Sequence, residues 1–180
     1  VELEALYLLG NPLASLPVEI AYLVGLETFD LDSKTDILFQ EILNYRKATK
    51  AIYEAEQSGQ DTLSLENFGL VKLPPEIGKL TALKELNLGN NRLAELPPEI
   101  WNLVGLEKLY LQENRLRSLP PEIGNLLGLT DLNLAHNNLT FLPFYMGKLV
   151  ELKEFNLSYN KLSQLPPLIG NLLGLERLSL

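Results

Sequence analysis

The chain has 180 residues, 46% of them apolar, which is enough for one domain or one repeat array with a substantial core. Its formal net charge of −8 argues against a nucleic-acid partner, because an acidic protein repels phosphate backbones. The absence of cysteine excludes a disulfide framework, a thiolate zinc site and a cysteine nucleophile, and no apolar run is long enough to predict a membrane span.

Residues 1–32 are predicted to hold the first two copies of a short repeat. The first copy follows the spacing L-x-x-L-x-L-x-x-N-x-L at Leu3, Leu6, Leu8, Asn11 and Leu13. The second copy opens with Leu26, Phe29 and Leu31. Because the central pair of each copy alternates with period 2, we expect it to point inward from a short strand.

Residues 33–59 are predicted to be an inserted or capping helix that spans about 36–57. Its apolar residues recur at spacings of three and four: Leu38, Ile42, Tyr45, Ala48, Ile52 and Ala55. Ser33 or Thr35 is expected to cap the start of the helix, and Gly59 to follow its end. Two arrangements remain open, since the helix could separate two arrays or lie as an insertion inside one.

Residues 60–180 are predicted to form the main array, as one continuous solenoid domain. A Leu-Pro step recurs every 23 residues, at Leu73-Pro74, Leu96-Pro97, Leu119-Pro120, Leu142-Pro143 and Leu165-Pro166. The return segment L-P-P-E-I-G-x-L suits a short helical turn, because proline fixes φ and glutamate favours a first turn. We therefore predict an α/β, right-handed solenoid with eight parallel strands on its concave side and short helical segments on its convex side.

Other columns of the repeat are predicted to be structural. The asparagines Asn91, Asn114, Asn137 and Asn160 are expected to form a ladder that bonds backbone groups where the chain leaves each strand. Trp101 is interpreted as convex-side packing. The single histidine, His136, and the lack of phosphate-binding, zinc-protease or hydrolase motifs indicate no catalytic, cofactor or metal site and no enzymatic activity.

Polar side chains that flank the inward leucines are expected to face outward on the concave side. Their variety suits a wet, specific interface with another protein, although the asparagines among them could be only a solvated ladder. A cluster of carboxylates near the helix predicts a partner with a basic segment, and the tyrosines would be its aromatic anchors. The candidate binding residues are Asp30, Asp32, Glu66, Asn87, Lys108, Tyr110, Asp131, Asn133, Glu154, Asn156 and Tyr159.

The repeat template and the LPPEIGNL return segment resemble the leucine-rich repeat family. The run from Ala51 to Leu80 looks like the start of many bacterial arrays, including those of Roco-type GTPases, and the 23-residue repeat is similar to that of intracellular Ras-group scaffolds. The resemblance is specific for the fold, and the leading functional hypothesis is a non-enzymatic protein-binding scaffold that uses its concave face. Its alternatives are a sensor segment of a larger signalling protein, such as a Roco-type GTPase, or a structural subunit of a multiprotein assembly.

Two further expectations concern location and the end of the array. Extracellular members of this family usually close their ends with cysteine-bonded caps, which this chain lacks, so we expect a cytoplasmic protein. Leu180 lies in the middle of a predicted strand, so we expect that edge to meet further chain or another subunit.

Overall fold

The computed structural model describes residues 5–7, 28–30 and 33–180, with side chains from residue 40 onward. Eight parallel strands of three residues each lie in this part of the chain, as the repeat predicts. They are β1 (Ala5–Tyr7), β2 (Thr28–Asp30), β3 (Thr62–Ser64), β4 (Glu85–Asn87), β5 (Lys108–Tyr110), β6 (Asp131–Asn133), β7 (Glu154–Asn156) and β8 (Arg177–Ser179). Residues opposite one another in neighbouring strands are 23 positions apart.

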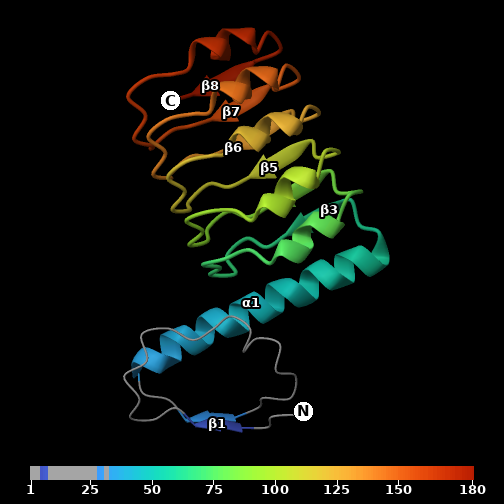
Figure 1. Ribbon diagram of the computed structural model, residues 1–180, viewed down its shortest axis with the longest axis vertical. Coiled ribbons are helices and arrows are strands. Elements are labelled where there is room, and N and C mark those ends of the chain that lie inside the picture. Colours follow the sequence, from blue (N-terminus) through green and yellow to red (C-terminus); the bar gives the residue numbers. More distant parts are fainter. Residues whose placement is uncertain (1–4, 8–27, 31–32) are drawn as a thin grey trace.

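The strands form two sheets. β1 pairs with β2, and β3 to β8 form a separate six-stranded sheet in chain order. The long helix α1 (Ser33–Ser58) lies between the two sheets (Figure 1). Its buried Ala48, Ile52 and Ala55 belong to the same apolar core as the repeats, so the helix covers the first end of the six-stranded array.

Helix α1 begins three residues earlier than predicted and ends one residue later. Its end has the expected glycine, with Gly59 at φ +63°. The N–H of Gln60 donates to the carbonyl of Ala55 at 3.2 Å, and that of Gly59 donates to Glu56 at 3.4 Å. These two bonds satisfy the last helical carbonyls in the Schellman arrangement, which requires the left-handed conformation that glycine adopts at little cost.

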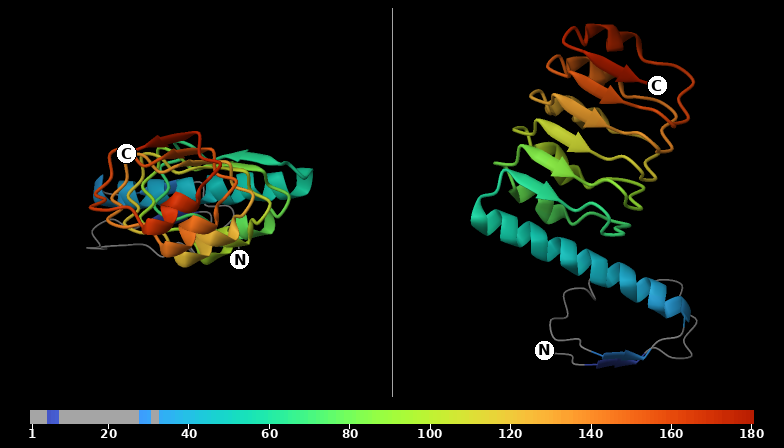
Figure 2. Two further views of the ribbon diagram at one scale, coloured as in Figure 1. Left: turned by 90° about the horizontal axis from the view of Figure 1, so that it is seen from above. Right: turned by 180° about the vertical axis from the view of Figure 1, so that it is seen from behind.

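The return segments are short 3-10 helices on the side of the array opposite the sheet (Figure 2). They are η2 (Pro75–Lys79), η3 (Pro98–Asn102), η4 (Pro121–Asn125), η5 (Phe144–Lys148) and η6 (Pro167–Asn171). Four of the five have proline in their first turn, where the missing N–H costs no hydrogen bond. The expected short helical turns are therefore confirmed.

Trp101 is buried, as expected for a packing residue, with 3% of its surface exposed. Neighbouring 3-10 helices otherwise approach closely through glycine: a Cβ added to Gly78 would lie 2.7 Å from the Cβ of Glu99. Trp101 replaces that glycine in η3, and η3 packs less closely on η4 than the other neighbours do. The indole therefore fills the space between two repeats.

The asparagine ladder is confirmed. In one repeat, the Oδ1 atom of Asn114 accepts the N–H of Leu93 at 3.0 Å. Its Nδ2 group donates to the carbonyls of Leu88 and Leu111 at 2.9 and 3.1 Å. Equivalent bonds occur at the other ladder asparagines Asn91, Asn137 and Asn160. Each amide thus joins the backbone of its own repeat to that of the preceding one.

Candidate functional site

The outward side chains of β3–β8 form a surface that we name the sheet face. The apolar residues at the centres of β3–β7 are buried, so the residues on either side of them point away from the core. Because equivalent residues are register partners, they line up as two rows across the strands. One row is Glu85, Lys108, Asp131, Glu154 and Arg177, and the other is Asn87, Tyr110, Asn133, Asn156 and Ser179.

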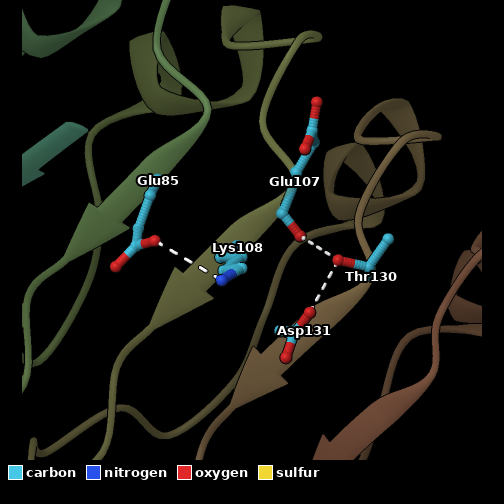
Figure 3. Close-up of polar contacts among 5 residues, drawn as sticks. All are labelled: Glu85, Glu107, Lys108, Thr130 and Asp131. Carbon is cyan, nitrogen blue, oxygen red and sulfur yellow. Dashed lines mark hydrogen bonds and ion pairs between the residues drawn. The ribbon is translucent and has the colours of Figure 1, made fainter. Parts of the chain in front are cut away.

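The charged row contains two ion pairs and one carboxylate without a cation. Lys108 lies 3.7 Å from Glu85, and Arg177 lies 3.1 Å from Glu154. Asp131 forms no ion pair within the described part of the chain. The Thr130 hydroxyl lies 2.6 Å from its Oδ2 atom and 3.0 Å from the Glu107 carbonyl, and its single hydrogen can bond only one of them at a time (Figure 3).

Tyr110 is the aromatic residue of the second row and is partly buried. Burial raises the pKa of its phenol above the ordinary value, Lys108 opposes that rise, and the carboxylates of Glu85, Asp131 and Glu154 add to it. The phenol therefore keeps its proton at neutral pH and can donate a hydrogen bond. It lines a hollow of about 160 Å³, together with side chains of β6, β7 and β8 that include Asp131, Asn133, Glu154, Asn156 and Arg177.

The outward asparagines have backbone partners that their sequence pattern did not reveal. The Oδ1 atoms of Asn87, Asn133 and Asn156 accept the N–H two residues further along, at 2.9, 3.1 and 3.0 Å. These bonds stabilise the turn that ends each strand. Within the described residues, the Nδ2 groups of Asn133 and Asn156 make no further hydrogen bond, so they can still donate to a ligand.

Glu66 and Tyr159 lie beyond the strand ends. The two carboxylate oxygens of Glu66 accept hydrogen bonds from the Nδ2 groups of Asn87 and Asn90, both at 3.0 Å. Tyr159 is 75% exposed and stacks on His136, with ring centroids 4.1 Å apart and an interplanar angle of 12°. Glu66 therefore adjoins the second row at Asn87, whereas Tyr159 belongs to an aromatic pair separate from Tyr110.

Of the two expected aspartates, Asp30 lies in the two-stranded sheet and not on the sheet face. Asp30 ends β2 in the two-stranded sheet, so helix α1 lies between its backbone and the six-stranded sheet that carries Tyr110. Asp32 lies outside the described residues. Since β2 does not pair with β3, a partner segment cannot follow one uninterrupted sheet from Asp30 to Tyr110. The candidate site is confined to the sheet face and its borders.

One column was missed entirely: the residue just before each ladder asparagine adopts a left-handed backbone, as does Asn67, which stands before Phe68 at the equivalent position. The column consists of Asn67, Asn90, Glu113, His136 and Tyr159, with φ between 52° and 60°. Asparagine tolerates this conformation, whereas other side chains pay roughly 1–2 kcal/mol for it. The two asparagines in the column were the available sequence signal.

Within the described residues, no group of three or more His, Asp or Glu residues could hold a metal ion. In that same part of the chain, no helix combines the length and the apolar character that crossing a membrane requires.

The leucine rich repeat family matches residues 61–116 and 104–162, which together make up more than half of the chain. The chain therefore belongs to the leucine-rich repeat family. Among solved structures it is similar to a leucine-rich repeat protein of Leptospira interrogans, with 33% sequence identity and a TM-score of 0.66. That similarity covers 93% of this chain but only 40% of the other one. No curated protein matches the chain.

Proposed function

We propose that the chain is a protein-binding module whose sheet face holds a basic segment of a partner protein. Domains of this family generally mediate protein binding, which supports the class of function. The observation that carries the finer proposal is the hollow beside Tyr110, where Asp131 lacks a cation while its neighbours in the row are paired. A lysine or arginine of the partner would complete that row.

The surroundings of Asp131 suit such a side chain in three ways. The carboxylate attracts the cation, and the hollow reduces its exposure to water, which strengthens the attraction. The Tyr110 ring offers a face for a cation–π contact, while its phenol and the Nδ2 groups of Asn133 and Asn156 can donate hydrogen bonds to partner carbonyls. An extended basic peptide fits this combination of one charge site and several donors.

The proposal is tested by affinity purification from the source cell with four purified baits and quantitative mass spectrometry. The baits are the wild-type chain, Asp131→Lys, Tyr110→Ala and the control Glu122→Lys, whose exposed carboxylate lies on η4 at the opposite side. A genuine partner is retained by the wild type and the control and is depleted by both sheet-face variants. An identical set of proteins on all four baits would move the interface off the sheet face.

A cytoplasmic location and the finer resemblance to Roco-type arrays and Ras-group scaffolds remain proposals. The cysteine-free composition supports the location, and the run from Ala51 to Leu80 supports the resemblance. Cell fractionation with an antibody against the chain tests the location. The sensor alternative is tested by sequencing the complete gene, since a phosphate-binding loop in the same protein would favour regulation of a GTPase.

A further inference from the structure

A second surface lies where the chain leaves the sheet toward the 3-10 helices. It is a groove of about 570 Å³, named here the lateral groove, which is lined by Ala94, Arg115, Arg117, Asn138, Thr140 and Lys161. These residues come from the same part of four successive repeats, directly after the ladder asparagines or two residues further on. The groove is therefore separate from the sheet face.

The cations of the lateral groove are unpaired, unlike those of the sheet face. Arg115, Arg117 and Lys161 are exposed, and none forms an ion pair or side-chain hydrogen bond within the described residues. Arg92 stands at the position equivalent to Arg115 in the preceding repeat and adds a fourth cation to this surface. The two repeats are joined here, because the N–H of Arg115 donates to the carbonyl of Leu93, the residue after Arg92. In a chain of net charge −8, this local excess of cations favours an anionic ligand.

Exposed aromatic side chains follow the groove residue Thr140 along the chain. Phe141 directly follows Thr140 and is 53% exposed, and Phe144 and Tyr145 are 63% and 45% exposed. These three residues are named the aromatic patch. The rings of Phe144 and Tyr145 meet edge to face with centroids 6.2 Å apart, and the Lys148 Nζ atom lies 4.9 Å from the Tyr145 centroid.

The aromatic patch occurs where the return segment departs from its template. Phe144 stands where the other segments have proline, and Tyr145 stands where three of them have glutamate, namely Glu76, Glu99 and Glu122. The substitution places an aromatic ring where those repeats have a carboxylate. An exposed apolar cluster of this kind, rimmed by polar residues, is typical of an interaction site.

We propose that the lateral groove and the aromatic patch together bind an acidic segment of a partner protein. Carboxylates of the segment contact Arg115, Arg117 and Lys161. The planar guanidinium group of each arginine can donate two parallel hydrogen bonds to one carboxylate. An apolar side chain of the segment packs on Phe141 and Phe144. A protein segment fits better than a nucleic acid, because the whole chain is acidic and the aromatic patch requires apolar groups from the ligand.

The proposal is tested by fluorescence anisotropy with the whole chain and a short fluorescein-labelled peptide of Glu with interspersed Leu and Phe. We expect saturable binding that weakens as salt screens the charges. The triple variant Arg115→Glu, Arg117→Glu, Lys161→Glu should bind at least about tenfold more weakly. The matched control Lys47→Glu, Lys50→Glu, Lys79→Glu has the same change in net charge at exposed sites elsewhere and should bind almost like the wild type.

Further measurements separate the apolar contribution to binding from the electrostatic one, and a peptide ligand from a simple anion. The variant Phe141→Ser, Phe144→Ser should lose about tenfold in affinity while the salt dependence stays that of the wild type. Asp131→Lys on the sheet face should leave this binding unchanged, so a failure here is distinguishable from a failure of the proposed function. The proposal is overturned by absent binding at about 1 mM, equal losses in both triple variants, or equally strong competition by tripolyphosphate.

Discussion

Replacing Asn114 by alanine removes one member of the buried asparagine ladder. The side chain is 7% exposed, so water cannot readily take its place. The N–H of Leu93, which bonds the Asn114 Oδ1 atom at 3.0 Å, has no other acceptor among the described residues. The variant therefore leaves a buried donor unpaired in the core of the array.

The three carbonyls that Asn114 also bonds are less affected, and that of Gln112 still accepts the N–H of Asn90 at 2.9 Å. Leu88 still accepts from Asn91 at 2.9 Å, and Leu111 still accepts from Asn137 at 2.9 Å. One unpaired buried N–H costs about 1–3 kcal/mol. Each carbonyl also loses one of its hydrogen bonds, which places the expected loss of stability toward the upper end of that range. We expect the free energy of unfolding to fall by about 2–3 kcal/mol.

Urea unfolding followed by circular dichroism measures this change, with two comparisons built into the chain. Asn160→Ala removes a half-buried ladder member whose partners water can reach, so we expect a smaller loss of about 1 kcal/mol. Asn125→Ala changes an exposed asparagine on η4 and should stay within about 0.5 kcal/mol of the wild type. Hydrogen exchange should also show that the Leu93 amide loses protection in Asn114→Ala. A stability for Asn114→Ala equal to that of Asn125→Ala would refute the structural role of the ladder.

Three other outcomes are expected. Leu109→Ala should lower the free energy of unfolding by about 2–5 kcal/mol in the same assay, because Leu109 is fully buried at a strand centre. Trp101→Ala should cost about 3–5 kcal/mol, because it leaves a void between η3 and η4, and a loss under about 1 kcal/mol would contradict that packing. Absorbance titration should show the pKa of Tyr110 above its ordinary value, and still higher in Lys108→Met. Since the folded state holds that proton more tightly, its contribution to stability is complete below the unfolded pKa and is lost as pH rises through the folded pKa.

The periodic columns of the sequence predicted the local structure well. Each column position has the same neighbours in every repeat, so the inward leucines, the ladder asparagines and the first-turn prolines have one structural role throughout. The division of the sheet was not predictable in this way. It depends on whether helix α1 covers the first end of the six-stranded array, which is decided by the packing of Ala48 and Ile52 against the repeats.

The exposed binding surfaces were harder to predict from the sequence than the buried columns. The template constrains buried columns, but it leaves the side chains of Arg115, Arg117 and Lys161 free, and their convergence on one groove requires the stacking of four repeats. The aromatic patch had a visible signal in the departure of Phe144 and Tyr145 from the template. The outward position of the charged row on the sheet face was predicted from the spacing of its residues. Which of its carboxylates lacks a cation depends on side-chain geometry, which the sequence does not show.

The way helix α1 joins the array has a consequence for building new proteins. The helix offers its apolar stripe to the first repeat much as another repeat would, and each later repeat joins the next with the same 23-residue register. The strand register is therefore the same at every junction between repeats, although Trp101 makes the packing between η3 and η4 different from the rest. A designer could delete or duplicate a whole 23-residue unit within this array and leave the remaining junctions intact, with the helix as a ready-made starting module.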